Sequence, residues 1–182
     1  MKNEKKIQII KAAQKSLSKH GLHKTTLDEI ARDLRMGKAT LYYYFQSKED
    51  IFYATVEFEI SQLAAEIAEI FSNETAGKEQ KLTEYLIYKE TALNKFPVLA
   101  QLYSFFMKET ANDKDSEMIK MLLAEETKLV SGVLNPEGKS KEEILMAASA
   151  LAVQSWGNCL AKKISPFNEI DLKIVYGQTA KI

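Results

Sequence analysis

The sequence has little cysteine, proline or glycine: its 182 residues include one, three and seven of these, respectively. The single cysteine, Cys159, excludes an intramolecular disulfide, and no group of cysteines and histidines has the spacing of a zinc site. We therefore expect no metal and no cofactor, and a reducing cytoplasm as the simplest location. The scarcity of proline and glycine favours long helices over an all-β fold.

Long apolar runs and catalytic patterns are also missing. Charged residues interrupt the basic N-terminal segment MKNEKKIQII, and no stretch approaches the length of a membrane span, so we expect a soluble protein that is not exported. The sequence contains no Ser/His/Asp or Cys/His arrangement, no glycine-rich phosphate loop and no carboxylate pair with metal-ligand spacing. These absences argue against an enzyme.

Charge is unevenly distributed along a chain whose formal net charge is zero. Residues 1–50 contain eleven Lys and Arg against six Asp and Glu, whereas the remainder contains fourteen against nineteen. A basic N-terminal part joined to an acidic remainder is typical of a nucleic-acid-binding domain attached to a domain with another role.

Apolar periodicity predicts an all-α fold with one or two domains and no strands. Capping boxes, glycines and prolines divide the pattern into about nine helices. We expect them near residues 3–20, 27–34, 37–45, 48–71, 78–95, 97–111, 115–133, 141–163 and 168–181.

The most informative segment is Thr25–Asp50, TTLDEIARDLRMGKATLYYYFQSKED. Thr26 and Glu29 have the spacing of a capping box, which predicts the start of a short helix. In the next helix Leu41 and Phe45 lie four residues apart and are expected to face the core. At 100° per residue, Ala39 and Tyr43 then point away from the core, Thr40 and Tyr42 flank them, and Tyr44 leans back toward the protein.

Small, hydroxyl and phenol side chains on an exposed short helix fit a DNA groove, because they allow close approach and contact base edges or thymine methyl groups. Lysines and the helix N-terminus suit phosphates. Double-stranded DNA is therefore the expected partner. The candidate contacts are Thr26, Gly37, Lys38, Ala39, Thr40, Tyr42, Tyr43 and Lys48.

The run from Ile7 through Asp50, and most closely TTLDEIA followed by KATLYYYFQSKED, resembles the DNA-binding domain of the TetR family of bacterial one-component repressors. The resemblance covers the N-terminal part of the chain. It implies a three-helix helix-turn-helix domain at 1–47 and a helical effector-binding and dimerisation domain at 48–182. It also implies a ligand-responsive repressor that binds a palindromic operator as a homodimer.

One turn departs from the family pattern. The family usually has Gly-Val-Ser between the two short helices, whereas this chain has Arg35-Met36-Gly37. Loss of the first glycine is expected to place a non-glycine residue in or near the left-handed conformation, at a cost of about 1 kcal/mol, or to change the turn. Gly37 remains an acceptable N-cap, and Arg35 is a possible phosphate contact. An altered turn also leaves open an alternative function, a helical interaction or ligand-binding protein of this fold with weakened DNA binding.

The segment 147–161 is rich in alanine, serine and glycine and is apolar over more of its circumference than one buried stripe requires. Pairing with a second copy would bury the excess, and the resemblance also implies that the last two helices form the dimer interface. The alternative is a buried central helix in a monomer. The candidate interface residues are Ala148, Leu151, Ala152, Ser155, Cys159 and Ile174.

Aromatic residues and methionines between residues 85 and 156 are candidates for an effector cavity, since such cavities combine an apolar lining with a few polar tips. The expected effector is a small apolar or aromatic molecule, and we expect no cluster of buried charge there. Core packing is the alternative for each residue. His20 and His23 are expected to be solvated. The candidate lining residues are Tyr85, Tyr88, Tyr103, Phe106, Met107, Met121 and Trp156.

Overall fold

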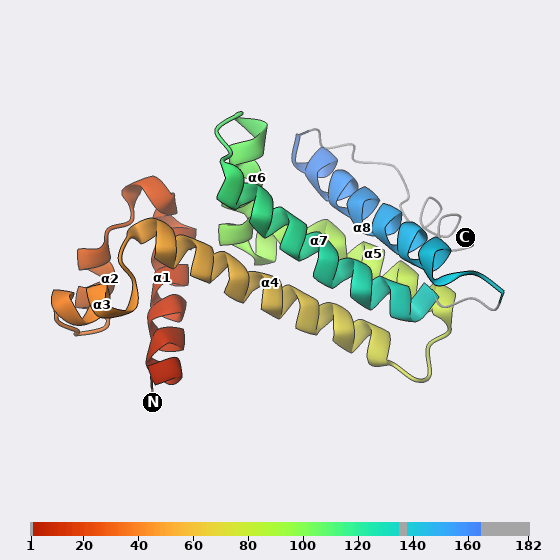
Figure 1. The fold of residues 1–182 in the computed structure, drawn as a ribbon, viewed down its shortest axis with the longest axis horizontal. Helices are drawn as coiled ribbons and strands as arrows, with labels where there is room; N and C mark the ends of the chain where they lie inside the picture. The colour runs from red at the N-terminus through yellow and green to blue at the C-terminus, as the bar shows by residue number, and fades with distance from the viewer. Residues whose placement is uncertain (1, 135–137, 165–182) are drawn as a thin grey trace. The chain divides into compact units, whose positions relative to one another are not determined.

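The computed structural model describes residues 2–134 and 138–164, and all regular secondary structure in these ranges is α-helical (Figure 1). The predicted ninth helix, 168–181, lies outside the described residues. None of the described helices is both long and apolar enough to cross a membrane. The helices are α1 (Lys2–Lys24), α2 (Leu27–Asp33), α3 (Lys38–Tyr44), α4 (Lys48–Ser72), α5 (Lys78–Lys95), α6 (Pro97–Met107), α7 (Asp113–Leu134) and α8 (Lys141–Ile164).

The chain forms two compact units. The first unit comprises residues 1–61 and 96–118, and the second comprises 62–95 and 119–182. The boundary at residues 61 and 62 falls inside α4, which is one continuous helix. These units differ from the proposed functional boundary between residues 47 and 48, which remains a prediction.

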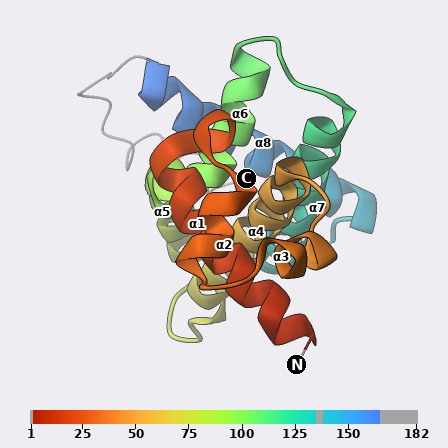
Figure 2. The same cartoon turned by 90° about the vertical axis from the view of Figure 1, so that its left-hand side faces the viewer.

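In the first unit, α1 packs against α2 and α6, and α2 packs against α3 (Figure 2). The apolar side chains between these helices are buried, which explains the helical spacing of their positions in the sequence. Glu59 of α4 also takes part in this packing: its carboxylate accepts hydrogen bonds from the Gln14 side chain at 2.9 Å and from the Leu99 amide at 2.7 Å. The buried apolar residues include Ile9, Ala13, Leu17, Ile30, Leu41, Phe45 and Leu99.

Gly21 interrupts α1 with φ 75° and ψ 168°, a backbone conformation that is essentially restricted to glycine. Backbone groups near this kink form hydrogen bonds with side chains from two other helices. Gln101 of α6 accepts from the Leu22 amide at 3.0 Å and donates to the Leu17 carbonyl at 2.8 Å. Lys48 of α4 donates to the Leu22 carbonyl at 3.3 Å. The kink therefore ties the end of α1 to both α4 and α6.

Candidate nucleic-acid interface and effector region

The start of α2 and its connection to α3 both follow the expectation from the sequence. Thr26 is the N-cap of α2, and its backbone amide and hydroxyl exchange hydrogen bonds of 3.2 Å with Glu29, which confirms the capping box. Arg35 has φ 51°, so a non-glycine residue does occupy the left-handed conformation, at a cost of about 1 kcal/mol. The Met36 amide closes the turn on the Ala31 carbonyl at 2.8 Å, and Gly37 is the N-cap of α3.

Helix α3 is anchored by two side chains and presents the others to solvent. Leu41 is 0% exposed and Phe45 is 4% exposed, as predicted from their spacing. Tyr43 is 68% exposed and Tyr42 is 42% exposed, while Tyr44 is half-buried with its ring edge against Tyr43. Exposed Ala39 and Thr40 complete this surface. The arrangement of side chains around α3 is thus confirmed, and their contact with DNA remains a prediction.

The two lysines proposed for phosphate contact differ in their surroundings. Lys38 lies 2.9 Å from the Asp28 carboxylate on an exposed surface, and this hydrogen-bonded, opposite charge raises the pKa of Lys38. The same ammonium lies 5.9 Å from the ring centroid of Tyr42. Lys48 is half-buried, and its ammonium donates to the Leu22 carbonyl. Lys48 therefore holds the end of α1, a role that sequence reasoning missed.

The N-terminal end of α1 also borders α3. Asn3 and Lys6 line a hollow of about 400 Å³ together with Tyr43 and Tyr44. The Lys6 ammonium lies 5.6 Å from the ring centroid of Phe45. Asn3 and Lys6 were not among the predicted contacts, although the basic character of the N-terminal segment was a signal for them.

The effector candidates Tyr85 and Trp156 lie in a buried polar cluster of the second unit. The Tyr85 hydroxyl and the Trp156 indole N–H both donate to the Glu126 carboxylate. Lys89 lies 2.7 Å from that carboxylate and 3.0 Å from the ring centroid of Trp156. The side chains of Lys89 and Glu126 are each 1% exposed, so the expectation of no buried charge in this region is wrong. Burial lowers the pKa of Lys89 to about 8 in spite of the Glu126 carboxylate.

The remaining effector candidates belong to different units. In the second unit, Met121 is half-buried and the half-buried Tyr88 donates to Glu66 at 2.6 Å. Burial and the Glu66 carboxylate raise the pKa of Tyr88. In the first unit, Tyr103 is buried near the end of α6, whereas Phe106 and Met107 are exposed. These seven residues are therefore not all members of the Glu126 cluster.

Helix α8 has two apolar faces. One packs within the chain and contains the five described residues that were predicted to meet a second copy, Ala148, Leu151, Ala152, Ser155 and Cys159; Ile174 lies outside the described residues. The other face is exposed and carries Met146 (73%), Val153 (54%), Ala150 and Gly157. A Cβ added to Gly157 would meet nothing within 4 Å, so the space above it is open. Within the described part of α8, this exposed face is the one open to a second copy.

The two histidines near the end of α1 are exposed, as expected. No three His, Cys, Asp or Glu side chains in residues 2–134 and 138–164 are grouped so that they could hold a metal ion.

Comparison with known proteins gives matches in sequence and in fold. Residues 9–55 match the family model described as bacterial regulatory proteins, tetR family. The chain is 36% identical over 72 residues to the uncharacterized HTH-type transcriptional regulator YhgD of Bacillus subtilis. That match covers 38% of this chain and 38% of YhgD, so the matched part spans less than half of the curated relative.

Solved structures match over nearly the whole chain. A transcriptional regulator from Cytophaga hutchinsonii is 27% identical, with a TM-score of 0.71 and coverage of 95% of this chain and 89% of that chain. The regulator FadR from Bacillus subtilis, solved in complex with stearoyl-CoA, is 20% identical, with a TM-score of 0.66 and coverage of 96% and 95%. The second likeness concerns the fold alone.

Proposed function

Because residues 9–55 match the tetR family of bacterial regulatory proteins, we propose that the chain is a transcriptional regulator of this family that binds double-stranded DNA through α3. The observation that carries the proposal is the surface of α3. Leu41 and Phe45 anchor the helix, while Thr40, Tyr42 and Tyr43 face solvent around the small Ala39. Such a helix can enter a major groove, where hydroxyl and phenol groups reach base edges.

The phosphate contacts proposed for this interface come from several parts of the first unit. Thr26, Gly37 and Lys38 lie at the N-terminal ends of α2 and α3, where backbone amides and positive charge favour phosphate. Asn3 and Lys6 extend the surface through the hollow that they share with Tyr43 and Tyr44. Lys48 is kept as a weaker candidate because its ammonium is already bonded to Leu22.

The regulator is proposed to act as a homodimer through the exposed face of α8, because Met146 and Val153 leave apolar area open to water there. Ala150 and Gly157 on the same face would let two helices approach closely. A dimer holds two copies of α3 at a fixed separation, which suits a palindromic operator with half-sites about one helical turn or a small multiple apart.

A small-molecule effector, apolar or aromatic in part, is proposed to control this dimer as a repressor. The Bacillus subtilis FadR structure with stearoyl-CoA is consistent with an effector that has an apolar portion. Helix α4 has residues in both units. A displacement of α4 is therefore the proposed way in which effector binding changes DNA binding. A changed separation of the two reading helices would weaken binding to rigidly spaced half-sites.

The test is binding of the purified protein to duplex DNA from upstream of its own gene, measured by fluorescence anisotropy across a salt series. Tyr43→Ala is expected to weaken binding about ten- to hundredfold, the range for loss of a good groove contact. Tyr43→Phe keeps the ring and removes only the hydroxyl, so it should lose less affinity. Thermal unfolding of both variants checks that the fold is retained.

Scrambled duplex DNA of the same length and composition serves as the control. Equal, weak binding to both duplexes would contradict the proposal. It would favour the alternative of a helical interaction or ligand-binding protein that has kept the fold, for which the strained Arg35 turn is the supporting observation.

Asp28→Asn is expected to strengthen operator binding several-fold. Asp28 holds Lys38 at 2.9 Å on the surface proposed to meet DNA, so its carboxylate both occupies the lysine and repels phosphate. Removing the charge should also make binding more sensitive to salt. The slope of log K against log salt concentration should become more negative by about 0.9, the value for one phosphate contact. Glu57→Gln, on an exposed part of α4, makes the same change in net charge and should leave affinity nearly unchanged, because exposed charges beyond about 8 Å are screened. An equal gain in both variants would mean that only net charge matters.

A further inference from the structure

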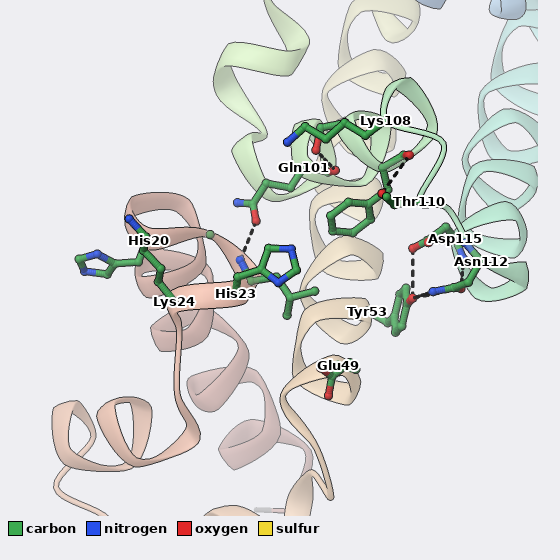
Figure 3. Close-up of a pocket in the computed structure, with 14 residues that line it drawn as sticks. His20, His23, Lys24, Glu49, Tyr53, Gln101, Lys108, Thr110, Asn112 and Asp115 are labelled. Carbon is green, nitrogen blue, oxygen red and sulfur yellow. Dashed lines mark hydrogen bonds between the residues drawn. The ribbon is translucent and has the colours of Figure 1, made fainter.

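The first unit contains a cleft of about 510 Å³ that the proposed effector region does not include (Figure 3). Its walls come from the end of α1, the beginning of α4, the end of α6 and the beginning of α7. Cavities that bind small molecules are typically about 300–1,000 Å³ and combine apolar walls with a few polar groups. Tyr53 and Phe105 supply two aromatic rings to this lining, and most of the other lining residues are polar.

Several polar groups of the cleft are already engaged. Asp115 is 0% exposed, and its carboxylate accepts from the Asn112 amide at 2.8 Å and from the Tyr53 hydroxyl at 3.1 Å. Its negative charge is therefore stabilised by one donor directly before α7 and by one from α4. The Gln101 side chain is also hydrogen-bonded within the chain: it accepts from the Leu22 amide and donates to the Leu17 carbonyl at the kink of α1.

Five other side chains in the lining are exposed: those of His20, His23, Lys24, Glu49 and Lys108 make no hydrogen bond or ion pair with the residues that the structure describes. Two of these are cations, two are imidazoles and one is a carboxylate. Among these exposed side chains, positive charges therefore outnumber negative ones. In Figure 3, Lys108 and Glu49 lie at opposite ends of the cleft, while His23 and Tyr53 face each other across it.

From this arrangement we propose that the cleft is a binding site for a small aromatic carboxylic acid. The ring would lie against Tyr53 and Phe105, and the carboxylate would point to Lys108, away from Glu49. A charged ammonium donor and a planar apolar wall together recognise such a ligand. Because one wall includes the Leu22 to Gln101 hydrogen bond, the bound acid would brace the end of α1 against α6.

The experiment is isothermal titration calorimetry of the full chain with sodium benzoate. Nine non-hydrogen atoms, at a ligand efficiency between those of drug-sized ligands and of the smallest ligands, give an expected Kd of about 1 mM. Lys108→Met should weaken binding about tenfold or more, the range for loss of one charge-assisted hydrogen bond. Lys114→Met is the matched control: this exposed lysine pairs with Glu117 outside the cleft and should leave benzoate binding unchanged.

Benzamide, which has nearly the same shape without the charge, distinguishes the class of ligand and should bind at least about tenfold more weakly than benzoate. Absence of benzoate binding up to about ten times the expected Kd would overturn the proposal. Equal affinity of Lys108→Met and the unchanged chain would place benzoate elsewhere and would also overturn it. The titration contains no DNA, so its failure is separate from any failure of the proposed regulator function.

Discussion

Lys89→Met is expected to destabilise the folded chain by about 3–5 kcal/mol, the usual result of removing one partner from a buried ion pair. Methionine fills a similar volume, so the loss is electrostatic. Without Lys89, the Glu126 carboxylate stays in a site where its side chain is 1% exposed. The hydroxyl of Tyr85 and the indole N–H of Trp156 still donate to it, but the ion pair with Lys89 is lost. Urea unfolding followed by circular dichroism at equal protein concentrations measures the change.

The double variant Lys89→Met/Glu126→Gln is the matched control. Glutamine keeps an oxygen acceptor for Tyr85 and Trp156 but carries no charge, so most of the lost stability should return. Replacing both members of a buried pair is often neutral or even stabilising. If the single and double variants were equally unstable, the cluster would owe its stability to packing around Lys89, including its contact with the Trp156 ring at 3.0 Å.

The double substitution Met146→Glu/Val153→Glu is expected to convert the proposed dimer into a monomer and to lower affinity for a full palindromic operator by about 10²–10⁴-fold. Charges at both positions would have to be buried against the same face of a second copy, which is strongly unfavourable. A linked second half-site raises affinity by this factor without any new contact, and a monomer loses that gain. Analytical ultracentrifugation and anisotropy with the full operator measure the two effects.

Gln154→Glu adds one negative charge to the neighbouring exposed position, whose direction on the helix differs from that of Met146 and Val153 by about 60° or more. It should remain a dimer. A duplex with one half-site adds a further control, because monomer and dimer should bind it with similar intrinsic affinity per reading helix. A dimeric Met146→Glu/Val153→Glu variant would show that another surface joins the two copies.

Helices α2 and α3 could be predicted almost to the residue because their signals are local, whereas α1, predicted to end at residue 20, continues past the Gly21 kink to Lys24. The Thr26 capping box, the Gly37 cap and the spacing of Leu41 and Phe45 all act within one or two turns. The end of α6 was predicted too late, at residue 111 instead of Met107. Glu109 ends the helix in a left-handed conformation with φ 56°, and neither glycine nor proline marks that position in the sequence.

The buried polar cluster could not be predicted for a different reason. Lys89 and Glu126 are 37 residues apart, and within its own helix each fits the pattern of a solvated charge. Only the packing of three helices brings them together with Trp156. The same holds for Lys48, whose ammonium meets the Leu22 carbonyl across 26 residues. Long-range pairing of polar groups leaves no periodic signal in a single sequence.

The hydrogen bond between the Leu22 amide and the Gln101 side chain makes that amide proton a reporter of the contact between α1 and α6. Most amides of α1 are held by carbonyls of the same helix, so their hydrogen exchange follows opening of the helix. The Leu22 amide is held by a side chain of α6 at 3.0 Å instead. Its exchange rate and chemical shift therefore report whether α6 stays packed on α1, at single-residue resolution.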